Sequence, residues 1–508
     1  MKRVLLYLLF FITMVANGQS YADEALMFAQ TSVSGTARSI GSAGAYGSVG
    51  ADLGCVTINP AGLGLYRSSD FSLTPAIMLD RRNSDFLSNK DQGGVNKFFI
   101  NQAGFSFTKL FNKEKKATDF SFSSTRLNAI TFALNYQRQN MFHQLIQWDG
   151  TNNFISAVSA YTDYLNATNK PLTPDNYPVE MVLAYDAGLI TYDTILAQYV
   201  SRVNKPVRQS GDMILGGAAD QIDAAIGGNV NDKFYFGAGV GFSILSYSFR
   251  NRFNEIDESN STSNFQDYNV DAALRTSGFG LHAKFGIIYR PASWVRLGVS
   301  YQIPTFYNLT ENYSVGLLAN FDTTYYGQTL SSYPLKYKLR TPMKGTISTS
   351  FYLKEFGFLS VDYEFQNLGS SRFYFGKDYQ SYTDAVNANE KKVYNFCHTI
   401  RAGIEAAYKT LRLRAGYAYS TTPYKKDYYN KQYPESIQQI SAGLGYRGKR
   451  FYVDFTYLIN LQKEIIYPYA DAVVKTTNYR HNMFLTVGYR LVRDETPSKK
   501  QKNTKMSF

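Results

Sequence analysis

Few side chains in this sequence could carry out covalent or metal chemistry. The chain has four histidines and two cysteines, which are His143, His282, His398, His481, Cys55 and Cys397. No Ser-x-x-Lys, Gly-x-Ser-x-Gly or His-Glu-x-x-His motif accompanies the histidines. The run Gly237-x-Gly239-x-Gly241 lacks the spacing of a dinucleotide fingerprint. We therefore expect no enzymatic activity, no metal site and no cofactor.

Three arginines could instead bind an anion. Arg412, Arg414 and Arg490 fall, with Asp454, on the polar faces of segments that alternate between apolar and polar residues. An arginine can hold a carboxylate headgroup through two parallel hydrogen bonds. The same residues could equally form an internal Arg–Asp network that holds one part of the chain to another. Whether the arginines bind a ligand or form a network depends on the structural elements that carry them.

Those elements alternate with a period of two residues. The clearest segments are 234–244, 411–419, 451–457 and 483–491. Their apolar faces often end in tyrosine, and their other faces carry Arg, Asp and Gly, which favours lipid outside and a polar lumen inside over a soluble sandwich. Aromatic residues make up 16% of the chain, with 42 Tyr and 36 Phe. Tyrosine suits a lipid–water boundary because its ring is apolar and its hydroxyl is polar.

The pattern predicts about 14 strands. They lie near residues 69–80, 97–110, 126–139, 212–228, 233–250, 268–290, 294–315, 335–352, 356–373, 393–408, 411–423, 436–447, 450–465 and 479–492. Short turns near 231–232, 291–292, 354–355, 409–410 and 448–449 alternate with longer loops near 81–96, 140–211, 251–267, 316–334, 374–392, 424–435 and 466–478. This is typical of an outer-membrane barrel, whose closure satisfies every backbone hydrogen bond in lipid. We predict an all-β fold, a transmembrane antiparallel β-barrel over residues 67–492.

The longest connection has a different character. Residues 140–211 contain two stretches with helical spacing, 154–165 and 195–203. They predict a helical external loop that covers the outer mouth of the barrel. This loop is either a surface that collects a ligand or a packed lid without one.

Both ends of the chain lie outside the predicted barrel. Lys2 and Arg3 precede an apolar stretch that ends in Ala16-Asn17-Gly18, which predicts a signal peptide over residues 1–18. The next residue is Gln19 rather than a cysteine, which argues against a lipoprotein anchor. Residues 493–508 are polar and rich in lysine, and they predict a flexible periplasmic tail. We expect both termini on the periplasmic side.

Residues 19–66 follow neither period and are too short for an independent domain. Their notable residues are Gly35, Arg38, Gly41, Gly44, Gly47, Asn59, Pro60, Ala61 and Gly62. Small residues let backbone pack against backbone, Pro60 fixes its φ angle, and Asn59 can cap its own turn. An empty barrel of about 14 strands would leave an aqueous pore. The segment therefore predicts an N-terminal hatch inside the lumen.

This segment resembles the FadL/OmpP1/TodX family of outer-membrane transporters. The resemblance covers residues 34–66 and rests on Gly35–Ser39, the spaced glycines, Asp52 and Asn59–Leu63. It implies a monomeric 14-stranded barrel with a hatch in a Gram-negative outer membrane, and passive uptake of long-chain fatty acids and other hydrophobic compounds. It also implies capture at an outer groove, release through an opening in the wall, and no energy-coupling partner.

Two features depart from the family's best-known members. Their third strand has a glycine-associated kink that opens the wall, whereas the predicted third strand here has no glycine between Leu127 and Leu134. Their outer groove is built by the third and fourth external loops, whereas the helical loop here is the second. The places of capture and exit therefore have to come from the structure.

Two further pairs of residues leave alternatives open. Pro304 and Pro342 lie in the seventh and eighth strands, where they mark either a gap in the wall or a pair of bulges. Cys55 and Cys397 either form a disulfide in an oxidising compartment or are small buried residues.

The expected partners follow from the predicted function. They are a fatty-acid-like ligand and outer-membrane lipid, including lipopolysaccharide, whose phosphates could meet Lys425 and Lys426 of an external loop. We expect a monomer and no nucleic-acid partner. The alternative function is a non-transporting scaffold that binds cargo within an outer-membrane secretion machinery.

Overall fold

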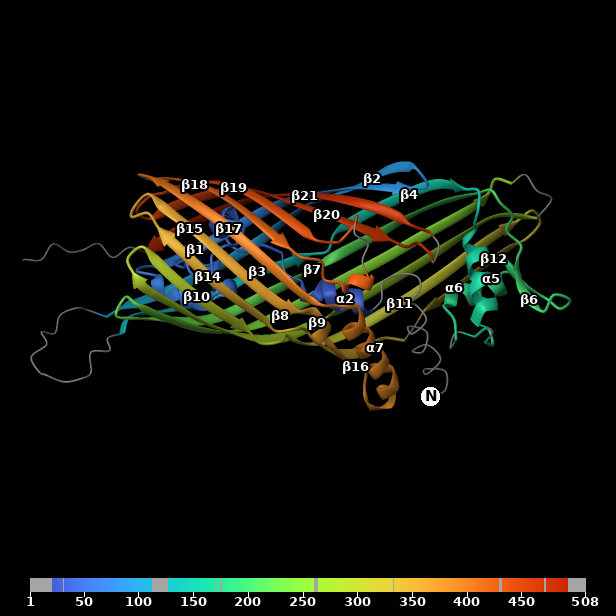
Figure 1. Ribbon diagram of the computed structural model, residues 1–508, viewed down its shortest axis with the longest axis horizontal. Helices are drawn as coiled ribbons and strands as arrows, with labels where there is room; N and C mark the ends of the chain where they lie inside the picture. The colour runs from blue at the N-terminus through green and yellow to red at the C-terminus, as the bar shows by residue number, and fades with distance from the viewer. Residues whose placement is uncertain are drawn as a thin grey trace, which may run out of the picture.

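The protein forms one antiparallel sheet that closes on itself (Figure 1). The computed structural model describes residues 21–30, 32–111, 127–168, 170–173, 176–259, 264–331, 333–428, 432–469 and 472–491. The predicted signal peptide and C-terminal tail lie outside the described residues. Strand β1 (Ser69–Phe86) pairs with β2 (Asn89–Leu110) on one side and with β21 (Val474–Leu491) on the other, which closes the barrel.

The wall consists of 14 strands. The remaining segments of the sheet are β3 (Leu127–Met141), β4 (Gln144–Asn152), β7 (Val207–Val230), β8 (Phe234–Asp257), β9 (Phe265–Ala292), β10 (Val295–Gln302), β11 (Phe306–Phe321), β12 (Tyr325–Ser331), β13 (Leu335–Arg340), β14 (Lys344–Tyr352), β15 (Gly357–Asn367), β16 (Arg372–Tyr374), β17 (Phe396–Tyr408), β18 (Leu411–Ser420), β19 (Ile437–Arg447) and β20 (Phe451–Ile466). Four wall strands are each broken into two segments, namely β3–β4, β10–β11, β13–β14 and β15–β16. Strand β12 only extends the hairpin beyond β11.

The alternation seen in the sequence gives each strand its two faces. On β8, Phe236, Val240 and Ile244 point outward, and Val240 is 65% exposed. The intervening Tyr235 and Ser243 are buried on the lumenal side. Exposed apolar side chains recur in this way around the outer surface, as expected of a wall that faces lipid.

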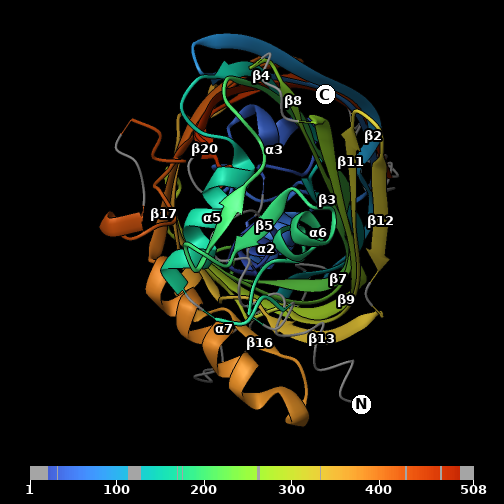
Figure 2. The ribbon, with the colours of Figure 1, turned by 90° about the vertical axis from the view of Figure 1, so that its right-hand side faces the viewer.

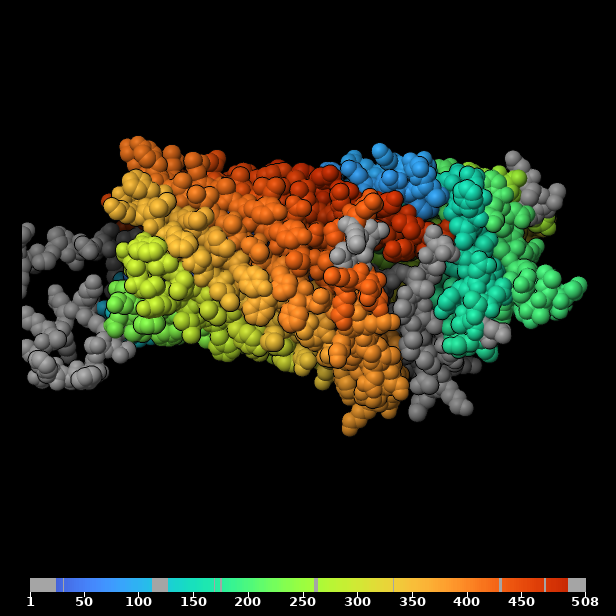
Figure 3. Space-filling view, in the orientation of Figure 1, coloured from blue at the N-terminus to red at the C-terminus, as the bar shows by residue number. Residues whose placement is uncertain are grey.

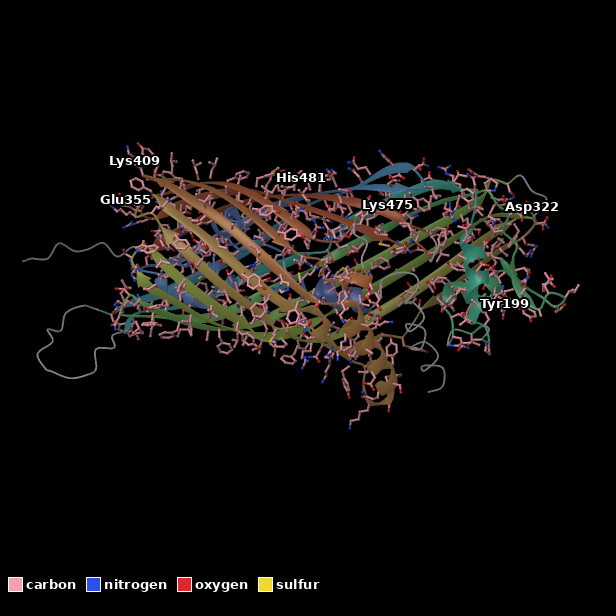
Figure 4. All side chains as sticks on the ribbon, viewed as in Figure 1. Tyr199, Asp322, Glu355, Lys409, Lys475 and His481 are labelled. Atoms are coloured by element: carbon pink, nitrogen blue, oxygen red, sulfur yellow. The ribbon has the colours of Figure 1, made fainter. Side chains whose placement is uncertain are left out.

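The two ends of the barrel differ. Most connections at one end, where Glu355 and Lys409 lie, are tight turns, and most connections at the other end, where Tyr199 and Asp322 lie, are longer (Figure 4). The exceptions are the β2–β3 connection, which lies largely outside the described residues, and the tight β1–β2 turn. We call these two ends the turn end and the helical end. The helices are α2 (Tyr21–Ala29), α3 (Ala37–Gly41), α4 (Cys55–Ile58), α5 (Ala157–Thr168), α6 (Val179–Asp186) and α7 (Gln380–Val393), with 3-10 turns η2 (Pro60–Leu65), η3 (Leu368–Ser370), η4 (Lys377–Tyr379) and η5 (Lys426–Tyr428). None of the helices in the described ranges is long and apolar enough to cross a bilayer.

Helices α5 and α6 close the helical end around a large aromatic core. This core joins Val158 and Leu183 of the two helices to wall residues such as Trp148 and Tyr268, and to Phe28 of α2. Helix α7 stands out from the side of the wall (Figure 3). Helix α2 contacts α7, whereas Leu491 pairs with Ser69 at the turn end. The described start of the chain therefore lies toward the helical end.

Several predicted loops are ordered elements. Residues 81–96, predicted as a loop, form the tip of the β1–β2 hairpin around Leu87 and Ser88, which both have positive φ angles (50° and 73°). The stretch 195–203 has helical spacing, but it lies largely in a hairpin of β5 (Ile190–Asp193) and β6 (Gln198–Ser201). The predicted loop 374–392 contains most of α7. Beyond the lipid both faces of a strand are polar, so hydrophobic alternation no longer marks where the strand ends.

Candidate functional site

Residues 32–66 lie inside the ring of strands in the end-on view (Figure 2). Their backbone forms hydrogen bonds with hydroxyl groups on the inner face of the wall, both as donor and as acceptor. Ala37 N donates to Thr486 Oγ1 (2.7 Å), and Thr456 Oγ1 donates to Ala37 O (2.6 Å). Ser441 accepts from Ala43 N and donates to Gly41 O (3.0 Å each). We call residues 32–66 the lumenal segment.

Glycines on the inner face of the wall make room for the lumenal segment. A Cβ atom on Gly237 would lie 2.2 Å from the carbonyl carbon of Pro60, and one on Gly416 would lie 2.4 Å from Ala43 N. Asn59 caps its own turn, as predicted, because its side chain accepts a hydrogen bond from Ala61 N (3.1 Å). The backbone of the lumenal segment therefore packs directly against the backbone of the wall at these glycines.

Gly237→Ala is expected to displace the Pro60 turn, because backbone atoms rather than a flexible side chain occupy the space of the new methyl group. Overpacking of this kind costs about 1–3 kcal/mol, measured by urea unfolding in lipid vesicles. The matched control is Gly239→Ala on the same strand, where the nearest atom to the new Cβ is the Cβ of Ala225 at 3.0 Å and the nearest backbone atom, Ala224 O, is 3.3 Å away. Equal losses of unfolding free energy in the two variants would contradict the proposed fit.

An ionic network ties the lumenal segment to the wall. Arg38 donates two hydrogen bonds to Glu405, from Nε and Nη2, each of 2.9 Å. The same carboxylate accepts from Arg414 Nε (2.7 Å), and Arg414 Nη1 also donates to Asp454 (2.7 Å). Asp454 accepts a further bond from Arg447 (2.8 Å). Arg414 and Asp454 are thus engaged in an internal network.

The other two predicted arginines also have partners in the structure. Arg412 donates to the carbonyl oxygens of Lys409 and Leu411 at a turn (2.8 and 2.7 Å). Arg490 lies over the ring of Tyr452, with 4.9 Å between the guanidinium carbon and the ring centroid. None of the three predicted arginines lines any of the three cavities described next.

A cavity of about 330 Å³ lies in the lumen between the connections of the helical end and the start of the lumenal segment. The apolar part of its lining comprises Leu26, Met27, Phe142, Ile146, Met213, Leu215, Phe249, Ile465 and Ile466. The polar part includes Gln366, Thr399, Arg401, Ser420, Gln439, Asn460, Gln462, Asn478 and Arg480, together with the carboxylates Glu364, Glu435 and Glu464. A lining that carries both apolar and polar groups suits an amphiphilic ligand.

Two smaller cavities adjoin the first one. Their volumes are about 60 Å³ and 30 Å³, and all three cavities have Ser32 in their linings. The cavity of about 60 Å³ is lined by Lys284, Lys344, Arg401 and Glu364 among others. No sequence motif marks these residues, because they are isolated polar residues on the inner faces of strands.

The wall is irregular where the smallest cavity meets it. The β2–β3 ladder stops at the pair Gln102–Gln137, although both strands continue. The lumenal segment occupies this edge: Ser32 N donates to the Gln139 carbonyl (3.0 Å), and Asn101 Nδ2 donates to Gly35 O (2.7 Å). The start of the segment thus bonds to both strands where they separate.

The third strand breaks although it contains no glycine near the break. Strands β3 and β4 are separated by Phe142 and His143, and Phe142 N donates to the carbonyl of Gly217 (3.0 Å). Gly217, on the adjacent strand β7, has φ of 93°, a conformation that side chains rarely adopt. The glycine that accompanies the irregularity is therefore on the neighbouring strand.

Pro304 and Pro342 lie opposite each other at breaks in the seventh and eighth strands. The ladder ends at Gln302–Lys344 and resumes at Phe306–Arg340. Thr341 N donates to Thr305 O, and Thr305 N donates to Thr341 Oγ1 (3.0 Å each), so hydrogen bonds bridge part of the interval.

Both cysteines are free thiols. Cys55 packs beneath Gly62, where burial, followed by the charge of Asp52, raises the pKa of its thiol. Cys397 lines the cavity of about 330 Å³ and donates to Thr421 O (3.4 Å).

Comparison with known proteins identifies the family. Residues 221–481, just over half of the chain, match the model of the family described as outer membrane protein transport protein (OMPP1/FadL/TodX). The chain belongs to this family. The match lies outside residues 34–66, so it confirms the resemblance from an independent part of the sequence. A comparison with curated protein sequences found no match.

Solved structures of FadL-family channels are similar to this chain. A Pseudomonas aeruginosa FadL homologue gives a TM-score of 0.53 at 14% identity, over 90% of this chain and 99% of that one. The Pseudomonas putida toluene transporter TodX gives 0.48 at 13% identity, over 90% and 98% of the two chains. The Ralstonia pickettii toluene transporter TbuX gives 0.46 at 14%, over 86% and 93%. The first likeness shows that the fold is shared.

Proposed function

We propose that this FadL-family chain takes up hydrophobic compounds such as long-chain fatty acids passively across the outer membrane, with residues 19–66 as its hatch. The observation that carries the proposal is the cavity of about 330 Å³, whose lining combines apolar and polar residues. Such a cavity can bury an acyl chain while its polar residues meet the headgroup. The family assignment supports transport of this general kind.

The proposed path runs from the cavity to the β2–β3 separation. Ser32 borders all three cavities, and Ser34 borders the two smaller ones. A shift of residues 32–35 away from β3 would join the cavity to the unpaired edge beyond Gln102–Gln137. This makes the start of the lumenal segment the gate. The break at Pro304 and Pro342 is the second candidate exit.

Three cations line the cavity of about 60 Å³ and could contact an anionic headgroup. Lys284 lies 3.8 Å from Asp223, while Glu364 lies 3.9 Å from Lys344 and 3.2 Å from Arg401. Asp362 also interacts electrostatically with Arg401, so three carboxylates accompany the three cations. An anionic headgroup would therefore have to compete with these carboxylates.

The direct test is uptake by proteoliposomes. Purified full-length protein should accelerate the entry of a labelled long-chain fatty acid well above protein-free vesicles, and mass spectrometry should recover co-purified amphiphiles. Entry at the protein-free rate, together with a stoichiometric protein partner and no bound lipid, would overturn the transport proposal in favour of the scaffold.

Met213→Glu is expected to weaken fatty-acid binding about tenfold or more, because it places a charge in the apolar part of the cavity lining. Gln439→Glu is the matched control, since it adds the same charge to the polar part of the same cavity. Binding can be measured by displacement of a fluorescent fatty acid from the purified protein. Equal weakening in the two variants would argue against an acyl chain on the Met213 side.

One observation favours the scaffold function. The tip of the β5–β6 hairpin exposes Ile195 (93%) and Leu196 (60%) at the helical end. Deletion of residues 190–201 should leave fatty-acid uptake intact if the chain is a transporter. In a scaffold, the same deletion should release a bound protein partner.

A further inference from the structure

Three basic residues occupy successive outward positions on one wall strand. Lys336, Lys338 and Arg340 are exposed on β13, whereas the intervening Tyr337 and Leu339 are 3% and 1% exposed and join the aromatic core inside the helical end. Side chains two residues apart on a strand lie about 6.5–7 Å from each other. We call Lys336, Lys338 and Arg340 the basic strip.

The strip faces outward because its strand changes face at the break beside Pro342. On β14 the outward residues have odd numbers, namely Ile347 (54% exposed) and Phe351 (38%), whereas on β13 they have even numbers. An extra residue in a strand produces such an exchange, because side chains alternate with a period of two. In an unbroken strand, the three cations would face the lumen, and Tyr337 and Leu339 would face outward.

The neighbouring strands exchange faces at the same level. Outward residues change from Tyr301 on β10 to Phe306 on β11, and from Tyr363 on β15 to Tyr374 on β16. The faces of these neighbouring strands therefore change at the same level, around Pro304 and Pro342. The outer surface is apolar on one side of this level and polar on the other, where Asn308 and Thr310 pair with Lys338 and Lys336.

The strip lacks carboxylate partners, in contrast to three other outward-facing arginines at the helical end. Arg208 pairs with Asp149 (Nε–Oδ1 3.0 Å), Arg250 with Asp271 (2.8 Å) and Arg252 with Asp212 (2.8 Å). These three pairs neutralise the rim along β7, β8 and β9. Within the described part of the chain, no salt bridge is formed by Lys336, Lys338 or Arg340.

We propose that the basic strip binds the phosphate groups of lipopolysaccharide in the outer leaflet, with the helical end of the barrel on the cell exterior. The strip begins where the apolar outer surface ends, which is the level of lipid headgroups in a membrane-embedded barrel. Arginine suits bidentate contacts with phosphate, and lysine supplies point charges. This proposal rests on the proposed outer-membrane orientation, but it does not depend on which ligand is transported.

The test uses full-length protein extracted from outer membranes in mild detergent. The variant K336Q/K338Q/R340Q removes three positive charges from the helical end, and the matched control K233Q/K409Q/K449Q removes three from the turn end. Native mass spectrometry counts the lipopolysaccharide molecules held by each folded barrel. We expect retention to fall roughly tenfold or more in the strip variant and to be unchanged in the control.

Other outcomes would overturn the proposal. Equal retention by the strip variant and the wild type would show that the strip does not bind lipopolysaccharide, and a loss in the control alone would reverse the orientation. Equal enrichment of phosphatidylglycerol and lipopolysaccharide by the wild type in mixed nanodiscs would show general anion attraction instead. The conservative variant K336R/K338R should keep its lipopolysaccharide. Fatty-acid uptake, measured separately, should be normal in the strip variant, so failure of this proposal and failure of transport are distinguishable.

Discussion

Glu405→Ala is expected to destabilise the folded barrel by about 3–5 kcal/mol, since it leaves buried guanidinium groups without their carboxylate. Glu405 is the shared partner of Arg38 from the lumenal segment and Arg414 from the wall, and only 4% of its side chain is exposed. The loss should appear as a lower urea midpoint in lipid vesicles. It should be accompanied by trypsin cleavage after Arg38, because the segment loses its anchor.

The matched control removes a carboxylate from an exposed pair. Asp149 pairs with Arg208 at the rim, where the two side chains are 34% and 51% exposed. Asp149→Ala should therefore change the unfolding free energy by less than about 1 kcal/mol. Comparable losses for Glu405→Ala and Asp149→Ala would mean that the network is not the anchor of the segment.

A disulfide between the lumenal segment and the wall is expected to abolish uptake. Ser34 Oγ donates to Asn101 Oδ1 (3.2 Å), so these two contacting side chains are the positions chosen for the cysteine pair. If residues 32–35 must leave the wall for a ligand to pass, uptake by the oxidised S34C/N101C variant should fall to the rate of protein-free vesicles. A reducing agent should restore it.

A second cross-link separates the two candidate exits. Thr305 and Thr341 are hydrogen-bonded across the break at the prolines, so T305C/T341C would join the seventh and eighth strands there. Uptake should continue after oxidation of this variant if ligands leave between β2 and β3. Loss of uptake in T305C/T341C but not in S34C/N101C would move the exit to Pro304 and Pro342. Single-cysteine variants control for the substitutions themselves.

The strands could be predicted from the sequence because the alternation of apolar and polar residues repeats along the chain. Alternation over 234–244 or 451–457 locates a strand and its two faces, because lipid and lumen impose opposite chemistry on neighbouring residues. The number of wall strands followed from the same signal. Asn59 was predicted to cap its own turn, because that bond is local, and the structure contains it.

Features that depend on a partner strand were missed. The break in the third strand is accompanied by Gly217 on β7, so inspection of the third strand alone found no cause. The exchange of faces at Pro342 needs one extra residue, and a single residue is too small an interruption to be recognised in the hydrophobic alternation. Glu405 and Arg401 find their partners only in the folded chain, which brings Arg38 of α3 and Glu364 of β15 beside them.

The lumenal segment is fastened unevenly. At Arg38 a bidentate ionic contact holds it to the β17 side of the bore, whereas Ser32–Ser34 reach β3 only through uncharged hydrogen bonds. We therefore expect residues 32–34 to separate from the wall more readily than the residues around Arg38. The residues around Arg38 can therefore keep the bore filled while residues 32–34 leave the wall, so local opening near β3 does not require the whole segment to move.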